Sequence, residues 1–128
     1  MSFHIFINME TKTCTSCNEK KLITEFYHQK DRKSGGSKCK QCHNEYCIQK
    51  WIKKKKDAIA YLGNNCNDCD KSFPDYPYVI FDFHHLNPSD KDVDWGKLRL
   101  RSWDKITKEL DKCVLLCSCC HRIRHHNE

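Results

Sequence analysis

Residues 113–125 read CVLLCSCCHRIRH, an apolar run that passes into a cysteine pair and then into two histidines. The apolar run predicts a short buried strand, and its continuation predicts the last helix, starting near Cys119 or Cys120. On that helix His121 and His125 would face the same way, because they lie four residues apart, and could share one metal ion. Cys117 and Cys120 have the CxxC spacing that lets two sulfurs from one turn bind the same ion.

A matching pair, Cys66 and Cys69, lies upstream, and 47 residues separate Cys69 from Cys117. One zinc ion held by both pairs would join the two ends of a long loop and position everything inside it. Within this loop the sequence predicts an extended stretch over 76–84, a polar loop over 87–94 and a helix over 103–110. The local order is therefore strand, loop, strand and helix.

Two more histidines, His84 and His85, end the predicted extended stretch. If that stretch packs against the final helix, one of them completes a metal site with His121 and His125 while its neighbour points at substrate. The alternative is that these four histidines and His126 are surface residues, or residues satisfied by other partners, in a histidine-rich chain. Two pairs that bracket a cysteine set favour the metal site.

The front of the chain carries the same cysteine pattern. Cys14 and Cys17 are followed, after 21 residues, by Cys39 and Cys42. This spacing is typical of a four-cysteine zinc ribbon with a structural ion. The aromatic pair 26–27 is expected to pack beside it and the sequence SGGS at 34–37 to form a turn. Iron or redox use is the alternative, which the lack of a surrounding βαβ pattern disfavours.

Composition explains why metal is needed. The chain has 128 residues, of which 38% are hydrophobic and 31% charged, so little apolar core is available per residue. Eight of its eleven cysteines fall in the four CxxC pairs. No secretory leader or membrane-spanning stretch is recognisable, and residues 1–10 are expected to be a loose or edge-strand terminus. We therefore expect an intracellular, cytoplasmic protein with reduced thiols that bind metal and form no disulfides.

The formal net charge is +6, from 23 lysines and arginines against 17 acidic residues. A basic, polar protein is attracted to polyanions, of which nucleic acid is the commonest in a cell. Charge alone is weak evidence, because lysines also simply solvate small proteins. DNA is nevertheless the expected partner, and no membrane contact is expected.

Between the two cysteine-rich parts, residues 44–63 have apolar side chains at three- to four-residue steps and predict an amphipathic helix that ends at Gly63. Its run of four lysines, 53–56, is expected to be a solvated face, with phosphate contact as the alternative. The predicted organisation is a zinc-ribbon-like unit over 1–43, this connecting helix, and an α+β core over 64–128.

Three segments together resemble a known family. They are residues 81–91 (FDFHHLNPSDK), residues 103–110 with Trp103, Ile106 and Glu109-Leu110, and residues 111–125 (DKCVLLCSCCHRIRH). Their motifs, order and spacing are similar to those of HNH endonucleases, especially the small ones common in bacteriophages. The front unit resembles the zinc ribbon that precedes the core in those proteins, so the resemblance covers roughly residues 12–126.

The resemblance implies a ββα-metal fold and DNA phosphodiester hydrolysis, by nicking or double-strand cleavage. His85 would be the general base, and His84, His121 and His125 would hold one catalytic ion, Mg²⁺ or Mn²⁺, with Zn²⁺ or Ni²⁺ as alternatives given all-nitrogen ligands. Two structural zinc ions would be held by two four-cysteine sets. These are Cys14, Cys17, Cys39 and Cys42, and Cys66, Cys69, Cys117 and Cys120. A phage-encoded protein acting in a host cell is implied.

This sequence departs from the family at one position. The asparagine that gives the motif its middle letter falls at about Lys112, which leaves the alignment of His85 open, with a main-chain carbonyl at its Nδ1 proton as one possibility. Asp82, on the same strand face as His84, could be a ligand, a partner of a ligand or a surface residue. Phosphate contacts are expected from the nearest basic side chains. They are Lys91, Lys97, Arg99, Arg101, Arg122 and Arg124.

Two other classes of function compete with a nuclease. One is a zinc-dependent DNA-binding module without catalysis, in which the histidines are incidental. The other is a thiol redox protein or iron–sulfur carrier, which would be coloured or carry reducible CxxC bonds. Cys47, Cys113 and Cys119 are left over and are expected to be small buried or loop residues without a catalytic role.

Overall fold

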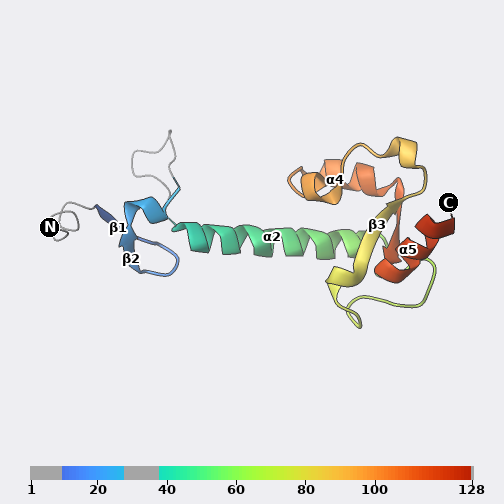
Figure 1. The fold of residues 1–128 in the computed structure, drawn as a ribbon, viewed down its shortest axis with the longest axis horizontal. Coiled ribbons are helices and arrows are strands. Elements are labelled where there is room, and N and C mark those ends of the chain that lie inside the picture. The colour runs from blue at the N-terminus through green and yellow to red at the C-terminus, as the bar shows by residue number, and fades with distance from the viewer. Residues whose placement is uncertain (1–9, 28–37, 128) are drawn as a thin grey trace. The chain divides into compact units, whose positions relative to one another are not determined.

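We describe the protein from a computed structural model, which describes residues 10–27 and 38–127. Over these residues the fold is α+β, with four α-helices and two two-stranded antiparallel sheets, which confirms the predicted class. The chain divides into two compact units, residues 1–50 and 51–128 (Figure 1). The terminus expected over residues 1–10, apart from Glu10, and the turn expected over 34–37 lie outside the described residues.

Unit 1 is a small hairpin with a cysteine loop. Strand β1, Thr11–Thr13, pairs antiparallel with β2, Lys20–Leu22, and a short 3-10 turn, Ile23–Glu25, follows. The chain turns at Asn18, whose φ of 61° lies in the left-handed region that asparagine tolerates. Among the described residues of this unit, Cys14, Phe26 and Cys39 form a buried cluster. So few buried side chains leave the unit dependent on whatever joins its cysteines.

Helix α2, Lys40–Tyr61, is longer and starts earlier than the helix predicted over 44–63. The earlier start places Cys42 in its first turn, so the second pair of the ribbon is partly helical. The helix ends as predicted at a glycine: Gly63 has a φ of +98°, which a residue with a side chain rarely adopts. Residues of α2 contribute to both units, since the division falls after Lys50.

Unit 2 has the predicted strand, loop, strand and helix order. Strand β3, Phe81–His85, pairs antiparallel with β4, Cys113–Cys117, and α5, Ser118–Asn127, follows β4 directly. The register aligns Phe81 with Cys117 and His85 with Cys113. The predicted extended stretch over 76–84 is wrong in its first half, because Tyr78–Ile80 forms a 3-10 turn. Figure 1 shows α5 lying beside the hairpin.

The connection between β3 and β4 is more ordered than the sequence suggested. After a 3-10 turn at Pro88–Asp90, a short helix α3, Trp95–Leu98, which was not predicted, precedes α4. Helix α4, Trp103–Leu110, has the predicted bounds. Its buried residues are Ile106, Glu109 and Leu110. One of these three is a carboxylate, and its burial requires a polar partner.

Two apolar clusters hold unit 2 together. Ile59, Phe81, Leu115 and Leu116 belong to the first, and Ala58, Leu98, Ile106 and Leu110 belong to the second. The last turns of α2 therefore supply one residue to each cluster, which fixes this part of the helix against the hairpin and against α3 and α4. No helix in the described parts of the chain combines the length and apolar character needed to cross a membrane.

Candidate functional site

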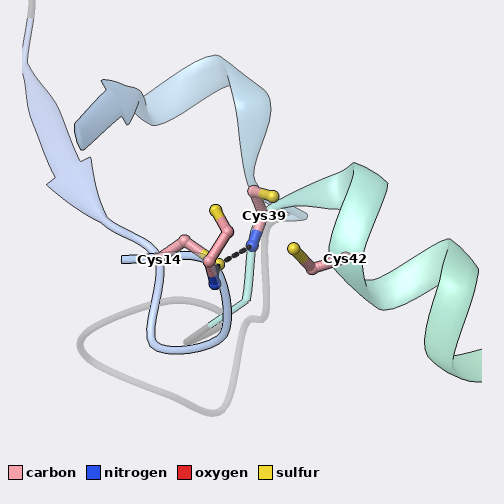
Figure 2. Close-up of side chains that lie close together, drawn as sticks. Cys14, Cys39 and Cys42 are labelled. Atoms are coloured by element: carbon pink, nitrogen blue, oxygen red, sulfur yellow. Dashed lines mark hydrogen bonds between the residues drawn. The ribbon is translucent and has the colours of Figure 1, made fainter. Parts of the chain in front are cut away.

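The first cysteine group lies where the loop after β1 meets the start of α2. Ligand atoms of Cys14, Cys17, Cys39 and Cys42 all lie within 4.8 Å of one another. Figure 2 shows the labelled members of the group and the hydrogen bond from the Cys39 N–H to Cys14 Sγ, at 3.3 Å. Backbone N–H groups of Ser16 and Cys17 also point at this sulfur, at 3.3 and 3.4 Å. Hydrogen bonds from Cys17 and Cys39 lower the pKa of Cys14 to about 6.

The second group joins the loop after α2 to the corner between β4 and α5. Cys66, Cys69, Cys117 and Cys120 also have their ligand atoms within 4.8 Å of one another. The Cys117 N–H donates to Cys66 Sγ at 3.2 Å, and the Cys120 N–H donates to Cys117 Sγ at 3.4 Å. Burial would raise the pKa of Cys66, but backbone N–H donors outweigh it and lower this pKa to about 7.

Both groups fit a zinc ion. All eleven cysteines are free. In a zinc tetrahedron with bonds of about 2.3 Å the sulfurs lie about 3.8 Å apart, whereas a disulfide brings them to about 2 Å. The sulfurs of Cys69 and Cys117 are 3.8 Å apart. N–H donors aimed at Cys14 and Cys66 favour the thiolate, the form that binds metal. Each group can therefore hold a structural zinc ion.

A third group consists of histidines alone. Ring nitrogens of His84, His121 and His125 lie within 4.8 Å of one another. His84 comes from β3 and is 6% exposed, while the other two come from α5. The Nε2 atoms of His121 and His125 are 3.0 Å apart, close to the roughly 3.0–3.4 Å between two nitrogens that bind one ion. The predicted convergence of the strand and helix histidines is therefore present.

Asp82 contacts one of these histidines. Its Oδ2 lies 3.1 Å from Nδ1 of His121. A carboxylate on one ring nitrogen fixes the tautomer, because the proton stays on Nδ1 and the lone pair remains on Nε2. Nε2 is the nitrogen that faces His125. Of the three roles left open for Asp82, the geometry matches that of a partner that orients a ligand.

His85 lies on the opposite face of β3 from His84 and has a partner that the sequence reasoning missed. Its Nε2 is 2.7 Å from Oε1 of Glu109, which is only 5% exposed. Burial would raise the pKa of Glu109, but hydrogen bonds from His85, the Asp92 N–H and Lys112 outweigh it and lower the pKa. An ionised Glu109 accepts the Nε2 proton, so Nδ1 of a neutral His85 carries the lone pair.

Lys112, the position at which the resemblance to HNH endonucleases implies an asparagine, fixes the neighbouring loop. Its Nζ donates to the main-chain oxygen of Asp90 at 3.0 Å and lies 3.2 Å from Asp92 and 3.1 Å from Glu109 Oε2. The loop after β3 is thereby tied to the end of α4. A main-chain carbonyl at Nδ1 was one possible partner of His85, and the structure instead places a side-chain carboxylate at Nε2. Glu109 lies one turn after the buried Ile106 on α4, and this position on the apolar side of the predicted helix was the signal by which the sequence could have revealed a buried carboxylate.

A pocket of about 310 Å³ opens beside these groups. Its polar lining includes Asp82 and His85 from β3, Glu109 from α4 and His121 from α5. Trp95 forms part of its apolar wall and packs on Phe83, with ring centroids 4.9 Å apart. Lys55 and Lys91 also line it. The pocket thus brings a candidate base, a metal-ligand candidate and two ammonium groups together.

Two of the basic residues expected to contact DNA have structural partners. Arg124 donates through Nε and Nη2 to the two carboxylate oxygens of Asp68, both at 2.6 Å, and holds α5 to the loop of Cys66 and Cys69. This contact lowers the pKa of Asp68. The Arg99 guanidinium lies over the Trp51 ring, 3.9 Å from its centroid.

The remaining four are closer to the surface. Lys91 pairs with Asp94 at the rim of the pocket and lowers the pKa of that carboxyl. Lys97, Arg101 and Arg122 are exposed. The structure brings Lys91 to the pocket and leaves the other three on the surface, so their DNA contacts stay predictions.

The three left-over cysteines lie in different surroundings. Cys113 is buried, and burial raises its pKa to about 11, as expected for a small core residue. Cys47 lies one turn from His43, with 3.6 Å between Sγ and Nε2. Cys119 is exposed.

Comparison with known proteins returned no matching family, no matching curated protein and no matching solved structure. The residues and their geometry therefore carry the functional argument.

Proposed function

We propose that the protein is a metal-dependent endonuclease of the HNH type that hydrolyses DNA phosphodiester bonds. The observation that supports this most is the convergence of His84, His121 and His125, with His85 lining the pocket that His121 also lines. Three neutral imidazoles can hold one divalent ion and leave positions open for water and phosphate. An adjacent histidine with a carboxylate behind it is a competent base at neutral pH.

The chain's residues divide the work between two sides of β3. His84, His121 and His125 would hold the ion, and Asp82 would keep His121 in the tautomer that binds it. When bound, a divalent ion offsets the charge that builds on the phosphate and on the leaving oxygen. Mg²⁺ or Mn²⁺ is the proposed ion, with Zn²⁺ or Ni²⁺ as alternatives, while two zinc ions in the cysteine groups would hold the fold.

His85 would act on the attacking water. Its Nδ1 takes a proton from water as the water oxygen bonds to phosphorus, and the bond from phosphorus to one sugar oxygen breaks. The leaving oxygen takes a proton from solvent. Glu109 holds Nε2 throughout and stabilises the imidazolium that forms. Exposed basic residues around the site, Lys97, Arg101 and Arg122, would contact DNA phosphates without reading sequence.

A supercoiled-plasmid assay tests the proposal. The wild type, His85→Ala and the control His126→Ala are incubated with plasmid and Mg²⁺, Mn²⁺, Zn²⁺, Ni²⁺ or EDTA. His126 is an exposed histidine on the same helix as His121 and His125. We expect metal-dependent nicking by the wild type and by His126→Ala, and a loss of about 10²- to 10⁴-fold in His85→Ala.

Zinc content and DNA affinity of each variant separate the rival functions. Under the proposal His85→Ala keeps two zinc ions per chain and binds a labelled duplex as the wild type does. A wild type that binds DNA but nicks no plasmid with any of the four metals would instead be a zinc-dependent DNA-binding module. A coloured protein with iron in place of zinc would be an iron–sulfur carrier.

A further inference from the structure

Four consecutive lysines on α2 lie in four different environments, and one of them turns into the pocket. Lys53 pairs with Asp57 at 3.0 Å. Lys54 donates to the main-chain oxygens of Arg99 and Arg101, just after α3, at 2.6 and 3.2 Å. Lys56 is exposed. Lys55 lines the pocket together with His85.

The helix geometry explains why Lys55 points inward. It lies three and four residues before Ala58 and Ile59, which are both fully buried in the core of unit 2. Side chains at these spacings share one side of a helix, so Lys55 continues the buried stripe toward the pocket. The sequence interpretation of the lysine run as a solvated face therefore holds only for part of it.

The ammonium of Lys55 is half-buried, and little nearby negative charge compensates for its lost hydration. Burial lowers its pKa, and the carboxylate of Asp82 opposes this from a distance. No acidic side chain in the described ranges lies within 4.0 Å of its Nζ, while Asp82 itself contacts His121. Its Nζ lies 6.0 Å from the centroid of the Tyr78 ring, and the exposed Lys56 lies 5.6 Å from the same centroid. A charge held in this way is stabilised when an anion enters beside it.

We propose that Lys55 is a phosphate-binding residue of the pocket, which contacts a non-bridging oxygen of the phosphodiester that lies against His85. The proposal rests on the proposed nuclease function and adds to it the residue that holds the anion. Lysine suits this task because its ammonium is a compact point charge on a flexible stem. A phosphodiester held from α2 would meet the base from β3 within one pocket, which is what catalysis by positioning requires.

The experiment compares Lys55→Gln and Lys55→Arg with Lys56→Gln in the full chain with both zinc ions bound. Lys56→Gln removes the same charge from the next position, where the side chain is exposed, so it measures the general attraction of DNA. Plasmid nicking at saturating metal should fall about 10- to 100-fold in Lys55→Gln, because a charged contact to the reacting phosphate is lost. Lys55→Arg should recover most of the rate, and Lys56→Gln should stay within about 3-fold of the wild type.

A second measurement excludes a purely structural role. If Lys55 served only to balance Asp82, its loss would change the charge around His121 and with it the metal affinity of the histidine group. Mn²⁺ affinity, measured by electron paramagnetic resonance, should therefore be the same in the wild type and in Lys55→Gln. Equal nicking by Lys55→Gln and Lys56→Gln, or a fall in Mn²⁺ affinity that matches the fall in rate, would overturn the proposal.

A binding measurement keeps this inference separable from the nuclease proposal. In a His85→Ala background, the affinity for a fluorescein-labelled duplex should fall further with Lys55→Gln than with Lys56→Gln. If the wild type cuts no DNA but this difference remains, the phosphate site stands and the enzymatic proposal fails. If nicking is normal and the two lysine variants bind and cut alike, the nuclease stands and Lys55 has no such role.

Discussion

The two four-cysteine groups have the same chemistry but enclose chain segments of different length and structure. In both, two CxxC pairs bring their sulfurs within 4.8 Å, and backbone N–H groups favour a thiolate. The first group closes over 21 residues, and its described core is three side chains. The second closes over 47 residues that contain β3, α3, α4 and most of β4.

This difference shows that the role of a structural metal depends on what its loop contains. In unit 2 a zinc ion would tie the start of α5 to the loop before β3, which sets His121 and His125 opposite His84. Every titratable group of the pocket except Lys55 and His121 lies inside the 47-residue loop. In unit 1 the equivalent ion would hold a hairpin to the start of α2. We therefore expect unequal consequences when one ligand of each group is removed.

The largest expected effect comes from Cys117→Ser. A structural zinc ion contributes about 10–16 kcal/mol to folding, more than a small core can replace. Loss of this ligand should unfold unit 2, remove one zinc ion per chain and abolish nicking. Zinc content by atomic emission, tryptophan fluorescence and plasmid nicking measure the three effects.

Cys42→Ser is the matched variant, since it removes one ligand of the same chemistry from the other group. It should also lose one zinc ion but keep unit 2 folded, because both apolar clusters of that unit are built from residues 58–117. Equal loss of tryptophan fluorescence in the two variants would show that the folding of unit 2 depends on both cysteine groups equally. All three tryptophans lie in unit 2, so the signal reports on that unit.

Much of unit 2 could be predicted because its signals are local. The apolar run before Cys117 gave β4, Gly63 gave the end of α2, and helical spacing put His121 and His125 on one side of α5. CxxC spacing predicted both cysteine groups, since two cysteines three positions apart can bring their sulfurs to the same ion from one turn of the chain.

The residues that the sequence did not reveal act across long separations. Glu109 reaches His85 over 24 positions, and Arg124 reaches Asp68 over 56. The position of Glu109 one turn after Ile106 hints at burial, but the local pattern does not name the partner of either side chain, because the packing of whole elements determines it. Lys55 was missed for the same reason: its direction depends on which face of α2 is buried.

Glu109 is one of the residues inside the 47-residue loop. Glu109→Gln keeps the shape of the side chain but removes the charge that stabilises a protonated His85. Nicking should fall about 100-fold, as expected when the partner that orients a catalytic histidine is lost. Zinc content should stay at two ions per chain, and the rate is measured on supercoiled plasmid at saturating metal.

Asp111→Asn provides the control for this change. Asp111 follows α4, is exposed and accepts a hydrogen bond from Tyr61 at 2.5 Å, away from His85. Its nicking rate should stay close to that of the wild type. Wild-type nicking by Glu109→Gln would mean that His85 needs no charged partner and that the carboxylate serves only to hold Lys112 and the loop after β3.

The smallest expected effect concerns Asp82→Asn, at the other face of β3. The amide can still accept a hydrogen bond from Nδ1 of His121, but it no longer raises the basicity of the ring, so Mn²⁺ affinity should fall about 10-fold. Asp94→Asn removes a carboxylate from the same pocket that pairs with Lys91 and contacts no histidine of the metal group, and it should leave this affinity unchanged. Under the proposed function Asp82 would act on the ion and Glu109 on the base, so added Mn²⁺ should restore nicking in Asp82→Asn and fail to restore it in Glu109→Gln. Equal rescue of both variants would mean that the two faces of β3 do not divide the work.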